Sequence, residues 1–90
     1  MKHAGPEALD QLEPILEEIR RRGGLKEKKR GAFYYRSSGF LHFHEDPAGF
    51  FADLKVGDDY IRLPINTKTQ TQIFLRRAAT ALNAVKNGRG

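Results

Sequence analysis

Apolar residues recur at helical spacing near both ends of the chain and alternate with polar residues in between. The first helical segment is Pro6–Arg22, which has acidic residues near its start and arginines near its end, as the helix dipole favours. Its apolar stripe consists of Leu9, Leu12, Leu16 and Ile19. Gly23-Gly24 ends the segment. Pro14 removes a backbone hydrogen bond inside it, so the helix either kinks there or divides into two shorter helices.

A second helix is predicted over about residues 68–87, with Thr67 at its start. Its apolar stripe consists of Phe74, Ala78, Ala81, Leu82 and Val85, with Ile73 beside it. A capping box can form between Thr67 and Gln70 or between Thr69 and Gln72. Between the two helices, Leu25–Arg30 is expected to be a charged connector.

Residues 31–66 alternate in polarity and are interrupted by turn residues, as in an antiparallel meander. The expected strands are about Ala32–Arg36, Phe40–Glu45, Phe50–Val56 and Tyr60–Ile65. The expected turns are Ser37-Ser38-Gly39, Asp46–Gly49 and Gly57-Asp58, and the last suits a two-residue hairpin. Residues 1–90 therefore form one α+β domain, in which a four-stranded meander packs both helices on one face.

The three turns together predict which side chains share a face of the sheet. The face toward the helices would carry Tyr34, Leu41, Phe43, Phe50, Ala52, Leu54, Ile61, Leu63 and Ile65. The opposite face would carry Phe33, Tyr35, Phe40, His42, His44, Phe51, Asp53, Lys55, Tyr60 and Arg62. Two helices leave that second face uncovered, and an uncovered aromatic face usually marks an interaction site. We therefore take it as the candidate binding face.

Composition adds limits on the function. The formal net charge is +5, with positive runs at Arg20–Arg30 and Lys86–Arg89, which favours polyanions. Cysteine is absent, so thiolate metal sites and cysteine nucleophiles are excluded. The start MKHAGPEALDQ has no apolar core and no run is long enough to span a membrane, so we expect a cytoplasmic protein without a membrane partner.

Three kinds of binding fit the open face. A two-fold homodimer, or another protein partner, could cover Phe33, Phe40 and Phe51. Single-stranded nucleic acid could stack its bases on the aromatic rings while Lys55, Arg62 and the basic connector contact phosphates. A small ligand or peptide could bind between this face and the Asp46–Gly49 loop. Self-association is the first of these interpretations, because homodimers are the commonest way to cover such a face.

A divalent metal site is the remaining alternative. His42 and His44 share a face and Asp53 should lie opposite His42, so these three residues are candidate metal ligands. A simpler interpretation pairs His42 with Asp53 and Asp53 with Arg62, and that pairing would raise the pKa of His42. Ser37 and Ser38 fit turn chemistry, so the His42–Asp53 pair lacks a nucleophile. We therefore expect a non-catalytic protein without a cofactor.

The segment FYYRSSGFLHFHEDPAGFFADLKV resembles an uncharacterised group of small bacterial proteins that share an FLHFHEDPAG-type core. The resemblance covers roughly Gly31–Ile65 and implies no particular activity. The order of helix, basic turn, meander and helix is more loosely similar to the MmcQ/YjbR-like proteins and the amino-terminal domain of TfoX-like regulators. The glycine-rich start of the TfoX-like domain is reduced here to Arg30-Gly31, so no functional residues are carried over.

Overall fold

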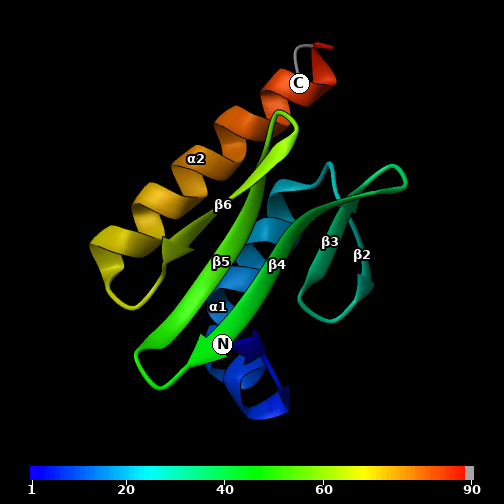
Figure 1. Ribbon diagram of the computed structural model, residues 1–90. Coiled ribbons are helices and arrows are strands. Elements are labelled where there is room, and N and C mark those ends of the chain that lie inside the picture. The colour runs from blue at the N-terminus through cyan, green and yellow to red at the C-terminus, as the bar shows by residue number, and fades with distance from the viewer. Residues whose placement is uncertain (89–90) are drawn as a thin grey trace.

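The computed structural model describes residues 1–88 and contains two helices and six strands (Figure 1). In chain order these are β1 (Lys2–His3), α1 (Pro6–Arg22), β2 (Lys26–Lys29), β3 (Ala32–Tyr35), β4 (Ser38–Asp46), β5 (Gly49–Val56), β6 (Asp59–Pro64) and α2 (Lys68–Lys86). The α+β class is confirmed. Within the described residues, no helix has the length and apolar character needed to cross a membrane. Arg89, the last charge of the predicted basic tail, lies outside the described residues.

All strands belong to one antiparallel sheet, in the order β2-β3-β4-β5-β6, and β1 pairs with β4 beside this path. The predicted count of four strands is wrong because two strands were missed. The expected connector contains β2, an edge strand whose lysines can face solvent while its backbone pairs with β3. The two residues of β1 are too few to show any alternation.

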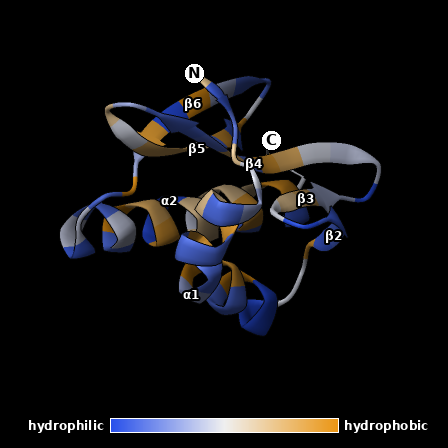
Figure 2. Cartoon of the chain, turned by 90° about the horizontal axis from the view of Figure 1, so that it is seen from below, coloured by the Kyte–Doolittle hydropathy of each residue, from blue (hydrophilic) through white to orange (hydrophobic). Residues whose placement is uncertain are grey.

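Both helices lie on the same side of the sheet in Figure 2, and their apolar stripes meet the strands there. Leu12, Leu16 and Ile19 of α1 are buried, and Phe74 of α2 packs edge-to-face on Phe43 of β4 at 6.0 Å between ring centroids. α1 is a single helix with Pro14 inside it, so of the two alternatives left open at Pro14 the division into two helices is wrong.

The turn chemistry fixes two hairpins and the start of α2 as expected. Phe43 lies opposite Ala52 across β4–β5, and Leu54 lies opposite Ile61 across β5–β6. Thr67 accepts a hydrogen bond from the Gln70 amide at 3.1 Å, so the first of the two predicted caps is correct. Gln70 accepts from Asn66 at 2.8 Å, one residue before the position that a capping box requires.

The pairing of β3 with β4 differs from the prediction. Phe33 lies opposite Leu41 and Tyr34 lies opposite Gly39, which leaves Phe40 as an extra residue in β4, a β-bulge. Phe33 and Phe40 are each 1% exposed and belong to the core, so their predicted place on the open face is wrong. Tyr35 packs against the core too. The hairpin turns at Arg36-Ser37, with Arg36 at φ 57°, rather than at the expected Ser37-Ser38-Gly39.

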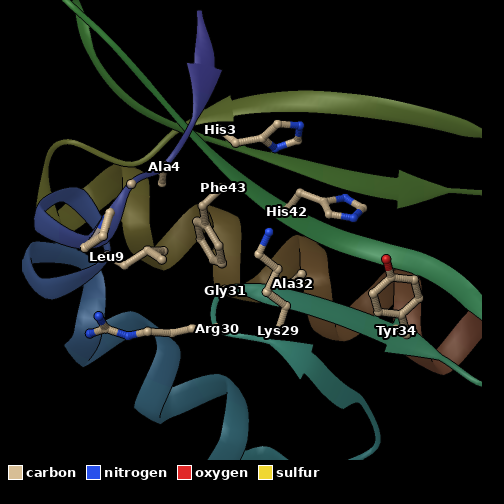
Figure 3. Close-up of a pocket in the computed structure, with 12 residues that line it drawn as sticks. His3, Ala4, Leu9, Lys29, Arg30, Gly31, Ala32, Tyr34, His42 and Phe43 are labelled. Carbon is tan, nitrogen blue, oxygen red and sulfur yellow. The ribbon is translucent and has the colours of Figure 1, made fainter.

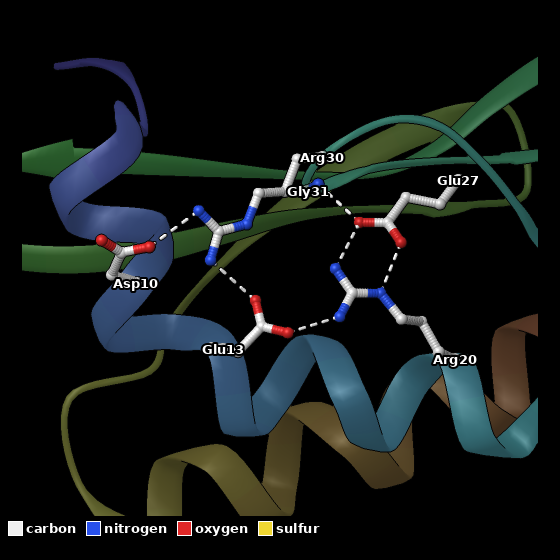
Figure 4. Close-up of polar contacts among 6 residues, drawn as sticks. All are labelled: Asp10, Glu13, Arg20, Glu27, Arg30 and Gly31. Carbon is white, nitrogen blue, oxygen red and sulfur yellow. Dashed lines mark hydrogen bonds and ion pairs between the residues drawn. The ribbon is translucent and has the colours of Figure 1, made fainter.

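A group of ion pairs joins α1 to the β2–β3 hairpin (Figure 4). The Arg20 guanidinium donates to both Glu13 and Glu27, and the Arg30 guanidinium donates to Asp10 and Glu13 at 2.8 Å each. Glu27 accepts from the Gly31 amide at 2.9 Å as well. Much of the predicted basic run is therefore neutralised by the acidic residues of α1 and β2.

The core position of Phe33 predicts a large loss of stability on truncation. We expect Phe33→Ala to lower the free energy of unfolding by about 3–5 kcal/mol, because it leaves a cavity between sheet and helices. Ile73→Ala is the control: Ile73 is 43% exposed on α2, and its loss should change stability by about 0.5 kcal/mol or less. Urea unfolding followed by circular dichroism measures both, and a cost below about 1 kcal/mol for Phe33→Ala would contradict the bulged register.

Candidate functional site

The face of the sheet that points away from the helices is the open face. Its composition follows from strand alternation around the buried residues Leu41, Phe43, Ala52 and Leu54, and around Ile61 and Leu63, which pack against the core. The predicted members that the structure places there are His42, His44, Phe51, Asp53, Lys55, Tyr60 and Arg62.

Tyr34 lies on the open face and not on the core face where it was expected. Its ring meets that of His42 edge-on, at 6.1 Å between centroids, and the Lys28 ammonium lies 4.5 Å from its centroid. The bulge is the physical reason. The extra residue in β4 shifts the register by one, so Phe33 turns to the core face and Tyr34 to the open face.

His3 and Lys28 are members of the open face that the sequence analysis missed. His3 lies opposite His44 in the β1–β4 pair, and the two imidazoles stack at 4.7 Å between centroids. Both residues come from strands that were not predicted, and a two-residue strand gives no periodic signal. For Lys28, the available signal was the alternation of lysine and glutamate in Lys26–Lys29, which suits an edge strand.

The charged centre of the open face is Asp53. Its two carboxylate oxygens accept from the Arg62 guanidinium at 2.7 and 2.8 Å, a bidentate pair. The nearest imidazole is that of His44, with Nε2 3.0 Å from an Asp53 oxygen, although His42 is the cross-strand neighbour. The Arg62 guanidinium holds the pKa of the Asp53 carboxyl below its ordinary value of 3.8, against the opposing effect of burial.

Three rings form a continuous row across the open face: Tyr34 on β3, His42 on β4 and Tyr60 on β6. His42 and Tyr60 lie 6.2 Å apart, and the Tyr60 hydroxyl donates to the Gly39 carbonyl at 2.5 Å. A Cβ at Gly39 would lie 3.1 Å from the His42 ring and 3.3 Å from the Tyr60 oxygen. Glycine at this position therefore allows the two rings to come together over β4.

The positive charge on the open face that has no carboxylate partner belongs to lysines. Among residues 1–88, the side chains that form ion pairs with carboxylates are arginines and His44, and no lysine does so. Lys55 donates instead to the Ser38 hydroxyl at 2.7 Å. Lysines on this face consequently keep their charge available for an external anion.

The expected rise in the pKa of His42 is wrong. Burial lowers the pKa of His42 below its ordinary value of 6.5, and the neighbouring His3 and His44 lower it further. Asp53 acts in the opposite direction with a smaller effect, since its charge is already paired with Arg62.

The candidate metal ligands His42, His44 and Asp53 do not form a usable set. Within the described residues, no three His, Cys, Asp or Glu side chains are grouped so that they could hold a metal ion. Asp53 is occupied by Arg62, and His42 packs between two tyrosine rings.

No family model matches the chain, and neither does any curated protein or any solved structure. The resemblance to small bacterial proteins with an FLHFHEDPAG-type core therefore stays a prediction.

The environment of His42 predicts that folding stability changes with pH in the direction opposite to that expected for a salt-bridged histidine. Because its pKa is lowered in the folded state, the stability that neutral His42 contributes is present above pH 6.5 and is lost as pH falls through the folded pKa. An NMR titration of the histidine ring resonances should give His42 a pKa below 6.5. His44→Gln should raise that value by removing a positive neighbour, and Asp53→Asn should lower it. A value above 6.5 in the unmodified protein would contradict the burial argument.

Proposed function

We propose that the protein is a binding module that takes single-stranded nucleic acid on its open face. The observation that carries this proposal is the row of Tyr34, His42 and Tyr60 rings, flanked by lysines without carboxylate partners. Bases stack on such rings whatever their sequence, and phosphates of a single strand can reach cations beside them. The proposed activity is binding, without a chemical step.

The charge arrangement supports a polyanionic ligand. Lys28 lies against the Tyr34 ring and Lys55 lies on the same face as Tyr60, directly across from it between β5 and β6. The single carboxylate between them, Asp53, is held by Arg62 and lies beside His44. Cations thus flank both ends of the ring row, while the central negative charge is compensated.

Self-association through the open face is the second candidate, and burial of Phe33 and Phe40 removes much of its support. A stable two-fold interface buries roughly 1,200–2,000 Å² and has an apolar centre. The exposed large hydrophobic side chains in residues 1–88 are Met1, Val56, Tyr60 and Ile73. Of these, only Tyr60 belongs to the ring row, and its phenol is amphipathic. The ring row therefore does not supply the apolar centre that such an interface needs.

The test is an amide chemical-shift titration of labelled protein with a mixed-sequence single-stranded oligonucleotide at two salt concentrations. We expect shifts at Tyr34, His42, Lys55 and Tyr60. Tyr60→Ala should weaken binding by about 5- to 150-fold, because stacking one base contributes roughly 1–3 kcal/mol. Tyr60→Phe is the matched control that keeps the ring and should retain most of the affinity.

Charge variants separate specific contacts from general attraction. Lys55→Gln should reduce the slope of log affinity against log salt by about 1, and Arg77→Gln on the exposed surface of α2 should leave it unchanged. Shifts confined to residues 20–30 would contradict the proposal. So would a free protein that is dimeric in sedimentation analysis and becomes monomeric with Tyr60→Ala, since that result assigns the face to self-association.

A further inference from the structure

A cleft of about 590 Å³ opens at the edge of β4, between β1 with the start of α1 and the β2–β3 hairpin (Figure 3). Its origin lies in the strand pairing. β3 pairs with β4 as far as Leu41, and β1 pairs with it from His44, so the segment His42–Phe43 between them has neither strand as its ladder partner. The volume is in the range of pockets that hold small organic ligands.

The cleft has an apolar floor and a rim of rings. Leu9 of α1 and Phe43 of β4 form the floor, and His3, Tyr34 and His42 stand at the side of the open face (Figure 3). Gly31 allows the hairpin to approach α1, because a Cβ there would lie 2.7 Å from Leu9. A flat, partly apolar ligand could contact this floor and the rings together.

The charge of the lining favours an anion. Of the residues in the described chain that line the cleft, none is Asp or Glu. In Figure 3 the Lys29 side chain points toward His42 and Phe43, whereas the Arg30 guanidinium points away toward α1, where it pairs with Asp10 and Glu13. Lys29 is thus the cation in the cleft that has no carboxylate partner.

We propose that this cleft binds one nucleotide through its terminal phosphate, with the phosphate at Lys29 and the base against Tyr34 and His42. The proposal rests on the proposed function, because Tyr34 and His42 belong both to the ring row and to the rim of the cleft. The cleft would then receive the phosphorylated end of a strand that lies on the open face. The shared chemistry is a nucleoside monophosphate group, free or at a strand end.

The experiment uses adenosine 5′-monophosphate, adenosine and inorganic phosphate as probes in separate NMR titrations of the full chain. With the monophosphate we expect saturable shifts at four cleft residues, His3, Lys29, Tyr34 and His42. Adenosine should bind at least about tenfold more weakly, because it lacks the phosphate that forms a charged hydrogen bond. Lys29→Gln should weaken monophosphate binding by about tenfold. Lys68→Gln, exposed at the start of α2 and outside the cleft, is the control and should have no effect.

A pair of oligonucleotides distinguishes the two sources of the nucleotide and separates this inference from the proposed function. A 5′-phosphorylated strand that binds about tenfold more tightly than its unphosphorylated form, with the gain lost in Lys29→Gln, assigns the cleft to a strand end. Monophosphate binding without any strand binding keeps the cleft and overturns the proposed function. A different result would overturn the inference and leave the proposed function standing. In that result the strand binds through Tyr60, its affinity does not depend on the 5′-phosphate or on Lys29, and the monophosphate causes no shifts in the cleft.

Discussion

The bulge at Phe40 is the constraint on which both faces of the sheet depend. One extra residue in β4 turns the rings of Phe33 and Phe40 toward the helices and brings Tyr34 to the side of His42. A bulge interrupts the ladder, but burying a phenylalanine ring contributes roughly 1.5–3 kcal/mol, so two rings can offset that loss. β3 pairs with β4 only as far as Leu41, and β1 pairs with β4 from His44 onward. The cleft lies at the stretch of β4 between these two pairings.

Arginine and lysine have different roles in this protein. Arginine presents a planar fork that matches a carboxylate, and Arg20 and Arg30 use it to hold the hairpin to α1, as Arg62 does to hold Asp53. Lysine is a point charge on a flexible stem and forms none of these pairs within residues 1–88. The arginines of the Arg20–Arg30 run are therefore structural, whereas its lysines on β2, together with Lys55 on β5, keep a charge that is available to a ligand.

The sequence was sufficient for the parts of the fold where turn residues determine the register. Gly57-Asp58 and the Asp46–Gly49 segment placed Leu54 opposite Ile61 and Phe43 opposite Ala52, as observed. It was insufficient at β3–β4, because a bulge leaves no mark in a period of two and both Phe33 and Tyr34 suit either face. His42 was assigned the wrong pKa shift because its burial, which lowers the pKa most, was not expected. His3, from an unpredicted strand, lowers it further, and Asp53 pairs with Arg62 and His44 rather than with His42.

Asp53 at the centre of the open face is the feature that most opposes an anionic ligand, and its surroundings decide how much it matters. A carboxylate repels phosphate while its charge is uncompensated, and here Arg62 binds both oxygens in a partly exposed position. His44 lies 3.0 Å away and adds positive charge when it is protonated. The pair also fixes Arg62 along the sheet, so that Asp53 serves to position a cation and leaves the ring row between Tyr34 and Tyr60 without a net negative charge at its middle.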